Sequence, residues 1–411
     1  TTTGDKNVAI GRDALNNNTT GSSNTGIGYD SLKANTTGTS NVGVGAYTLA
    51  ANTTGGYNIA LGLYAAYYNQ TNVVLGQNCH QTNVSGSHNI CMGKQALFTA
   101  TNADDNVAIG KEALKVSVQG FQVAIGSESL TANTTGINNI GMGYRSLYAN
   151  TSGGQNVAVG AYALDANTTA DNNTAFGYAA LSENTTGTIN TGIGRSALLS
   201  TTTGSANTAV GSQAIDAVTT GGENTAIGAD AGGSCTTGDR NTFIGRDAGY
   251  NITTGSRNTY VGEIVAASSA AVSLEYVLGN GLTGKGTQTC FLGGNTGAFN
   301  EKNVTTFETT SDERIKKNIV DNNSGLDILN QIQVRNFEYR TEEEIVDFDN
   351  PKAAVVKKEG VQLGVIAQEL EKVLPESVRT QSTGVKTVDS DSFTWYLINA
   401  VKELSAKVAA L

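Results

Sequence analysis

Residues 190–206 read NTGIGRSALLSTTTGSA, and residues 207–223 read NTAVGSQAIDAVTTGGE. Both stretches begin with Asn, place Gly four residues later, follow it with a small and a large apolar residue, and end in a Thr- and Gly-rich loop. The unit recurs along the chain and is therefore the first feature to interpret. Its leading residues are Asn7, Asn24, Asn41, Asn58, Asn72, Asn89, Asn106, Gln122, Asn139, Asn156, Asn173, Asn190, Asn207, Asn224, Asn241 and Asn258.

The step between copies is the same nearly everywhere, as from Asn7 to Asn24, and this seventeen-residue repeat predicts one turn of a β-solenoid per copy. We expect a short strand at residues 8–10, a corner at Gly11, a second short strand near Ala14-Leu15 and a return loop at residues 18–21. Gly suits a corner with positive φ, and stacked Asn side chains can form an amide ladder. Ala with Ile or Val would fill a thin core that neighbouring turns complete. Sixteen turns at about 4.8 Å give a stalk of roughly 75 Å.

The repeat resembles the Asn-x-Ala-Ile-Gly-x-x-Ala repeats of trimeric autotransporter adhesin heads, which are left-handed parallel β-rolls. It is also similar to the Asn-Thr-Ala-Val-Gly-Tyr-x-Ala-Leu repeats of tail-fibre-like proteins. The resemblance implies an all-β solenoid, left-handed and trimeric, in a fibre shaft of about sixteen turns at residues 1–266. Weaker copies end at Gly279 and Gly293, so residues 267–310 are expected to be degenerate turns and a neck.

Composition excludes several functional classes. The net charge is −10 with no long basic run, so we expect no nucleic-acid partner. No stretch approaches the roughly 18 apolar residues of a membrane span. The chain opens in the end of a repeat, so we expect it to be a piece of something longer, with its N-terminal attachment region missing. We predict no cofactor and no metal site: a metal site at His80 and His88 is the less favoured interpretation, because small buried apolar roles suit the cysteines, which are Cys79, Cys91, Cys235 and Cys290.

Two surface features of the repeats allow more than one interpretation. The Asn-Thr-Thr triplets match the N-glycosylation sequon, and regular Thr could form an ice-binding face, but we favour turn chemistry in the loops. Tyrosines near the corner Gly could stack on receptor sugars or pack between turns or chains, and we favour packing. The triplets begin at Asn18, Asn35, Asn52, Asn133, Asn167 and Asn184, and the tyrosines are Tyr29, Tyr47, Tyr64, Tyr144, Tyr162 and Tyr178.

The repeat ends after Gly293, and residues 309–319 read TTSDERIKKNI. In this stretch Lys316 follows Ser311 by five residues. A Lys in an apolar setting loses its proton and can serve as the base for a Ser hydroxyl. Any surface Ser and Lys could match this spacing by chance, so the spacing alone does not establish a catalytic pair.

The stretch resembles the Ser-Asp-x-Arg-x-Lys-x-Asn-Ile signature of the C-terminal intramolecular chaperone of endosialidases and other phage tail fibres and spikes. The match continues through residues 326–329, 334–339, 363–370, 374–376 and 395–411. The resemblance implies a small α+β domain at residues 311–411 that trimerises and then cuts its own chain. In that family Ser311 would be the nucleophile attacking the Thr310 carbonyl and Lys316 its base, with Lys317 a neighbouring candidate for the base. Signature residues that would hold the cleavage turn are Asp312, Arg314 and Asn318.

The sequence predicts two helices in this domain. One spans residues 365–373 and is stopped by Pro375. The other closes the chain at residues 395–411. Its apolar residues have the 4-3-4-3 spacing of a coiled-coil seam, although a helix docked on its own domain gives a similar stripe. The seam is formed by Leu397, Val401, Leu404, Val408 and Leu411.

Taken together, these features predict a homotrimeric phage tail fibre, structural and host-receptor-binding, that is made in the host cytoplasm and acts extracellularly in the virion. Its expected partners are its own copies, tail or baseplate proteins, and a cell-surface glycan or protein receptor. Its only expected enzymatic activity is one turnover of serine-peptidase-type autoproteolysis, with no external substrate. The alternatives are a bacterial or injection-system surface adhesin and a glycan-degrading tailspike, which would need two carboxylates across a groove.

Overall fold

The computed structural model divides the chain into two compact units, residues 1–310 and 311–411. The structure describes residues 3–68, 72–82, 86–101, 103–293, 298–300, 317–341, 344, 359–380 and 385–411. Each unit has its own architecture, and the two are described separately.

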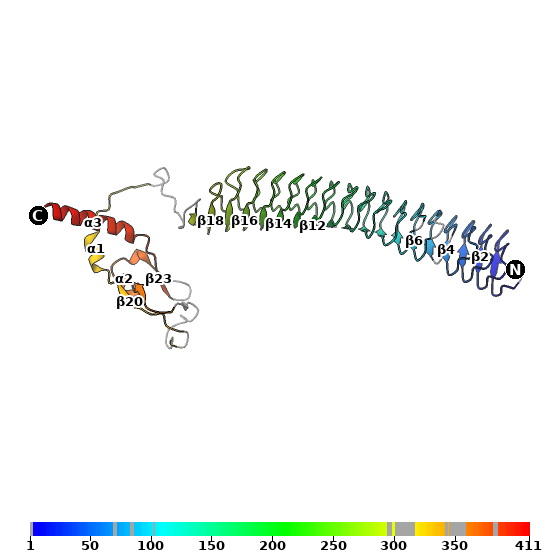
Figure 1. Cartoon of the computed structure of the whole chain (residues 1–411), viewed down its shortest axis with the longest axis horizontal. Helices are drawn as coiled ribbons and strands as arrows, with labels where there is room; N and C mark the ends of the chain where they lie inside the picture. The colour runs from blue at the N-terminus through cyan, green and yellow to red at the C-terminus, as the bar shows by residue number, and fades with distance from the viewer. Residues whose placement is uncertain are drawn as a thin grey trace. The chain divides into compact units, whose positions relative to one another are not determined.

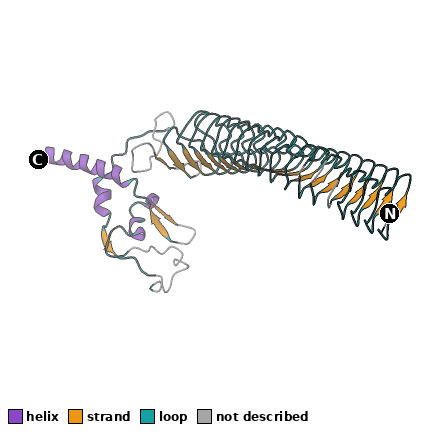
Figure 2. Ribbon diagram, turned by 45° about the vertical axis from the view of Figure 1, so that its right-hand side comes forward, coloured by secondary structure: helices purple, strands orange, loops and turns teal. Residues whose placement is uncertain are grey.

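The first unit is a parallel β-solenoid with one three-residue strand in each turn (Figures 1 and 2). Strands β1 to β18 pair in chain order, and each residue lies beside its equivalent in the next turn, as Val8 beside Thr25. The all-β solenoid prediction is confirmed, and the parallel ladder continues through the weaker copies after residue 266. The strands are β1 (Val8–Ile10), β2 (Thr25–Ile27), β3 (Val42–Val44), β4 (Ile59–Leu61), β5 (Val73–Leu75), β6 (Ile90–Met92), β7 (Val107–Ile109), β8 (Val123–Ile125), β9 (Ile140–Met142), β10 (Val157–Val159), β11 (Thr174–Phe176), β12 (Thr191–Ile193), β13 (Thr208–Val210), β14 (Thr225–Ile227), β15 (Thr242–Ile244), β16 (Thr259–Val261), β17 (Tyr276–Leu278), β18 (Cys290–Leu292) and the antiparallel β19 (Ala298–Asn300).

In β2 to β18 the central residue is buried in the solenoid and the two flanking residues face outward. In β13, Ala209 is buried, whereas Val210 is 37% exposed. Side chains alternate between the two faces of a strand, so a three-residue strand can bury only its central residue. The expectation that Ile and Val of the repeat fill the core is therefore wrong. The core instead combines the central Ala with a buried Leu from the opposite side of the turn, such as Leu198.

The corner glycines are required for two reasons. Gly11 has φ +121°, a conformation that L side chains rarely adopt, and a Cβ on it would lie 2.7 Å from the carbonyl oxygen of Gly28 in the next turn. The positive φ is as the sequence predicts, and the close stacking of one corner backbone on the next is a second reason for Gly.

The predicted second strand near Ala14-Leu15 is wrong, because this side of each turn is a series of tight turns. Asp13 and Leu15 both have left-handed φ values, 58° and 52°. A left-handed conformation costs an L-residue about 1–2 kcal/mol. Leu15 offsets this cost because its N–H donates to the carbonyl oxygen of Ser31, 3.0 Å away in the next turn. Burial of the Leu15 side chain stabilises the turn by a further contribution of roughly 1.5–3 kcal/mol.

The leading Asn residues form the predicted amide ladder inside the solenoid. The backbone N–H of Asn24 donates to Oδ1 of Asn7 at 2.9 Å, and Nδ2 of Asn41 donates to Oδ1 of Asn24 at 3.0 Å. Gln122 continues the ladder although its step from the preceding copy is one residue shorter, and its Oε1 accepts from the N–H of Asn139. Each turn is thereby bonded to the next by a buried side chain as well as by the strand.

A second ladder runs through the return loops. Nδ2 of Asn35 donates to Oδ1 of Asn18 at 2.9 Å and to the carbonyl oxygen of Gly38 at 3.0 Å. The neighbouring Thr19 hydroxyl donates to the carbonyl oxygen of Thr36 in the next turn. Because these Asn side chains are buried and their nitrogens donate within the loop, the turn-chemistry interpretation of the Asn-Thr-Thr triplets is confirmed.

The second unit is small and mixed. Its elements are α1 (Leu326–Gln331), β20 (Arg335–Phe337), β21 (Gln362–Gly364), α2 (Ala367–Leu370), the short 3₁₀ helix η3 (Pro375–Ser377), β22 (Val378–Thr380), β23 (Lys386–Val388) and α3 (Phe393–Ala409). Strands β20 and β21 pair antiparallel, as do β22 and β23. The predicted C-terminal helix is confirmed, whereas the helix expected at residues 365–373 is only α2 followed by a turn. Along the part of the chain that the structure covers, no helix is both long and apolar enough to span a bilayer.

Candidate assembly and processing site

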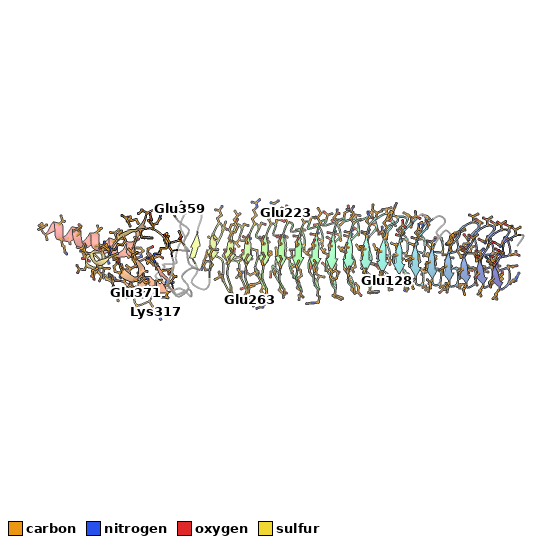
Figure 3. The ribbon with its side chains drawn as sticks, turned by 90° about the horizontal axis from the view of Figure 1, so that it is seen from below. Glu128, Glu223, Glu263, Lys317, Glu359 and Glu371 are labelled. Carbon is orange, nitrogen blue, oxygen red and sulfur yellow. The ribbon has the colours of Figure 1, made fainter. Side chains whose placement is uncertain are left out.

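The predicted catalytic residues Ser311 and Lys316 lie outside the described residues, together with Thr310, Asp312 and Arg314. The described part of the signature begins at Lys317, which is exposed (Figure 3), and Asn318, which is exposed and has a left-handed φ of 55°. Asn is among the residues that accept this conformation most readily. The chain therefore bends at Asn318.

Helices α1 and α3 pack closely where the signature segment enters the domain. A Cβ on Gly325 would lie 2.5 Å from the carbonyl carbon of Asn399, so only Gly fits at the start of α1. The Asn399 side chain donates to the carbonyl oxygens of Asn322 and Ser324, at 2.7 and 3.1 Å. The face of α3 that includes Asn399 and the buried Ala400 thus holds the segment leading from the signature to α1.

The apolar seam of α3 lies away from this contact. Val401 is 58% exposed and Leu404 52% exposed, and Leu397 and Val408 are also exposed. Ala400 is the buried residue of the helix. The interpretation of the stripe as a helix docked on its own domain is therefore wrong for these positions, since another face makes the contact with α1. In the described part of the chain, the seam is therefore an exposed apolar stripe.

A second apolar surface, here called the outer stripe, runs along the strands of the solenoid. It consists of the third residue of each strand from β1 to β18, and its members are exposed or half-buried, as Ile227 is at 44%. Apolar residues at successive turns make one continuous band, which monomeric proteins rarely expose. The outer stripe comprises Ile10, Ile27, Val44, Leu61, Leu75, Met92, Ile109, Ile125, Met142, Val159, Phe176, Ile193, Val210, Ile227, Ile244, Val261, Leu278 and Leu292.

The core changes character near the C-terminal end of the solenoid. Phe243 takes the central strand position that is Ala or Gly in most turns, and it is fully buried. Gly replaces Leu at both adjoining positions: a Cβ on Gly232 would lie 2.6 Å from Phe243 Cδ2, and one on Gly249 would lie 2.5 Å from Cε1. The sequence analysis does not predict this exchange of volume, although the paired loss of Leu and gain of Phe is visible in the sequence.

The Asn ladder ends at a buried carboxylate. Glu275 occupies the leading position of its turn, and its backbone N–H donates to Oδ1 of Asn258 at 2.9 Å. Its side chain accepts from the Tyr260 hydroxyl (2.9 Å) and from the N–H groups of Ser268 (3.1 Å) and Gly286 (2.7 Å). Burial, with Glu275 nearby, raises the pKa of Tyr260 well above its usual range. Tyr260 therefore stays a neutral donor to the carboxylate.

Two adjacent turns in the irregular part of the repeat hold two cysteines and a histidine, and all three are core residues. Cys79, His80 and Cys91 are buried, and His80 takes a Leu position. Burial lowers the pKa of His80 to about 3, so its imidazole is neutral. His88 lies apart on the surface. Within the described ranges, no group of three or more His, Cys, Asp or Glu side chains could hold a metal ion.

The corner tyrosines contact one another between turns. Tyr47 and Tyr64 stack with ring centroids 4.7 Å apart, and Tyr144 and Tyr162 meet edge-on at 5.3 Å. Arg145 lies over the Tyr144 ring. These contacts confirm packing between turns as a role of these rings.

Several surface carboxylates are paired with Arg in an adjacent turn. Glu128 and Glu223 accept from Arg145 and Arg240 at 2.8 and 2.9 Å, and they project from the solenoid in Figure 3. Burial raises the pKa of Asp165 and of Asp216. These two residues are three turns apart, about 14 Å along the ladder, which is wider than the carboxylate pairs of glycoside hydrolases.

Comparison with known proteins gives a family match in the second unit. Residues 311–379 match the family described as the chaperone of endosialidase. No curated protein and no solved structure matches the chain. The matched segment starts at the first residue of the second compact unit and follows a solenoid consistent with a tail-fibre-like repeat. The chain therefore combines an N-terminal β-solenoid with a C-terminal segment similar to the endosialidase chaperone family, which points to a tail-fibre or tailspike type of protein.

Proposed function

We propose that the protein is a homotrimeric phage tail fibre whose C-terminal domain assembles three chains and then cleaves itself off between Thr310 and Ser311. The solenoid is the shaft and carries the surface that contacts a host receptor. The observation that supports this best is the pair of unpartnered apolar surfaces, one in each unit. The α3 seam and the outer stripe would both be covered by copies of the same chain.

The α3 seam supplies the first contact between chains. Three helices with apolar residues at a and d positions bury those residues against one another. Burial of apolar area at about 25 cal/mol per Å² then favours the trimer over the separate helices. Since α1 occupies a different face of α3, the domain keeps its own fold when the seam is covered.

The solenoid needs such a starting point because its turns are nearly interchangeable. A chain shifted by one whole turn would pair Ala with Ala and Asn with Asn over most of its length. The distinct residues lie at the C-terminal end, where Phe243 fits only between Gly232 and Gly249 and where Glu275 finds its three donors. Alignment at this end fixes the register of the remaining turns.

Cleavage follows from the roles that the family resemblance gives to Ser311 and Lys316. The neutral Lys316 amine accepts the Ser311 hydroxyl proton while Oγ attacks the Thr310 carbonyl carbon. The C–N bond breaks, the amine of Ser311 takes the proton, and Thr310 is held as an ester on Ser311 Oγ. Water then hydrolyses the ester and leaves a Thr310 carboxylate and a free Ser311 hydroxyl.

After cleavage, the shaft no longer carries the domain that aligned the three chains. Unfolding and refolding would then have to take place without it. The shaft would then be held by a kinetic barrier as well as by its equilibrium stability. The boundary between the two compact units at residues 310 and 311 is consistent with a cut at this bond, because neither unit is divided by it.

Native mass spectrometry of the full-length chain tests the assembly. We expect three copies of the 42.4 kDa chain, or three shafts once cleavage is complete. Val401→Asp or Leu404→Asp in the seam should abolish the trimer, whereas Lys402→Ala on the same helix should not. A monomeric wild-type protein would contradict the proposal.

A further inference from the structure

Two thiols lie together inside adjacent turns of the solenoid. Cys79 occupies the position of Ala14 in its turn, and Cys91 is the central residue of β6. Both side chains are fully buried. A single buried cysteine behaves as a small apolar residue and needs no further role. Two cysteines at facing positions of neighbouring turns can also form a covalent bond.

Equivalent residue pairs in other turns show how close these two positions are. Ser31 and Gly43 occupy the same two positions in another pair of adjacent turns, and Ser31 Oγ lies 2.9 Å from where a Cβ on Gly43 would be. Ser129 and Gly141 repeat the relation with 2.5 Å. In a disulfide, with its S–S bond of about 2 Å, each sulfur lies about 3 Å from the Cβ of its partner. The two positions are therefore close enough for a disulfide, and in this structure Cys79 and Cys91 are in contact as free thiols.

We propose that Cys79 and Cys91 form an intrachain disulfide that ties the turn after β5 to β6 when the fibre meets an oxidising medium. The cystine would close the short loop between these two residues, and it lies just after the shortest step of the repeat, which runs from Asn58 to Asn72. A cross-link of this kind restricts the unfolded chain more than the folded one. The oxidising setting rests on the proposed extracellular function, whereas the geometry does not.

The oxidant is a small disulfide such as oxidised glutathione. One cysteine thiolate attacks it, forms a mixed disulfide and releases one glutathione thiol. The second cysteine then attacks the mixed disulfide and releases the other, so that two protein thiols are oxidised and one glutathione disulfide is reduced. In the folded turn, burial and contact with Cys79 raise the pKa of the Cys91 thiol. In the assembled fibre the exchange therefore requires local opening of this turn, which brings the two thiols into contact with the oxidant.

The other two cysteines cannot take part. Cys235 lies in a return loop, with its sulfur 3.8 Å from the carbonyl oxygen of Gly238, and Cys290 opens β18. Along the ladder, Cys235 is about eight turns from Cys91, which is about 40 Å. Cys235 and Cys290 are themselves more than three turns apart, about 14 Å or more, which is too far for a bond. They are internal controls for the thiol count.

The test is to refold the reduced full-length chain in a glutathione redox buffer, alkylate it in denaturant and map its peptides. We expect one cross-linked peptide joining residues 79 and 91, two alkylated cysteines at 235 and 290, and a melting temperature roughly 5 °C higher than that of the reduced protein. Cys91→Ala should remove both effects, whereas Cys235→Ala should keep them.

Four alkylated thiols per chain would overturn the proposal, as would a bond between Cys79 and a cysteine of another copy. The peptide map reports a bond within one chain whether or not that chain trimerises or cleaves. The experiment therefore distinguishes a failure of the disulfide proposal from a failure of the proposed function.

Discussion

The ring of Phe243 stacks on the ring of Tyr260 in the next turn, with centroids 5.9 Å apart and planes 6° from parallel. Elsewhere in the solenoid the central strand position is mostly small and the opposite side of the turn supplies a Leu. At this stack the volume is exchanged, since Gly232 and Gly249 stand where Leu would be. The stack therefore marks one place along an otherwise repetitive core, near the end of the solenoid that precedes the chaperone domain in the chain.

Gly249→Leu should destabilise the shaft even though Leu is the common residue at this position. The new side chain would collide with Phe243, and overpacking of this kind costs about 1–3 kcal/mol. The positive φ of Gly249, 66°, is not the obstacle, because Leu adopts 48–56° at the equivalent position of other turns. Phe243→Ala combined with Gly249→Leu removes this collision, so the double variant should be more stable in thermal unfolding than Gly249→Leu alone. Additive losses in the double variant would show that the two positions are not coupled.

Asn190→Ala should destabilise the solenoid strongly. Asn190 accepts from the backbone N–H of Asn207 at 2.9 Å and donates to the carbonyl oxygen of Gly204 at 2.8 Å. Its loss leaves two buried backbone groups unpaired at about 1–3 kcal/mol each. Denaturant unfolding should therefore give a loss of about 2–6 kcal/mol, whereas the exposed Asn17→Ala should lose almost nothing. Equal effects of the two variants would show that the ladder does not stabilise the stack.

Thr201→Asn should stabilise the shaft. The loop ladder stops at Asn184, whose Oδ1 is buried without a hydrogen-bond partner, and Thr201 Oγ1 in the next turn is likewise unpaired. An Asn at 201 would donate to Asn184 Oδ1 and extend the ladder, worth about 1 kcal/mol. Thr201→Val is the matched control, since it removes the unpaired hydroxyl without adding a donor. Calorimetry should rank Asn above Val, and the reverse order would contradict the ladder.

The buried imidazole of His80 should make the solenoid sensitive to acid. Its folded pKa of about 3 lies below the unfolded value of 6.5, so between these pH values the unfolded chain binds the extra proton. Stability should therefore fall as the pH drops from 6.5 towards 3, by up to about 1.4 kcal/mol per pH unit. His80→Leu should remove this dependence, and Leu97→His, at the equivalent position of the next turn, should introduce a second one. Parallel pH profiles for wild type and His80→Leu would be the contrary result.

The repeat allowed the stacked turns, the corner glycines and the Asn ladder to be predicted, because each is imposed by backbone geometry at a fixed position. The corner Gly has a positive φ from turn to turn, as Gly11 does. Asn24 and Asn41 likewise donate their backbone N–H to the same position of the preceding turn. One turn of the sequence does not show whether the Ile and Val side chains point into the core or outward. Three residues are too few to reveal an alternation, and the left-handed Leu15 follows no common sequence rule.

The chemistry proposed near Ser311 rests on the signature alone. A Ser and a Lys five residues apart occur by chance in many chains, and desolvation of Lys316 depends on the folded surroundings rather than on the spacing. The α3 seam was predictable from its 4-3-4-3 spacing. Its exposure was not, because Asn399 and Ala400 form a second face that decides how α3 meets α1.

The most direct test of the whole account is the intact mass of the expressed chain and of two variants. Wild type should separate into two pieces, residues 1–310 and residues 311–411, the second of which starts with Ser311. Ser311→Ala and Lys316→Ala should remain whole, and should still assemble as trimers because the α3 seam is unchanged. A wild-type chain that stays intact, or a variant that still divides between Thr310 and Ser311, would contradict self-cleavage by this pair.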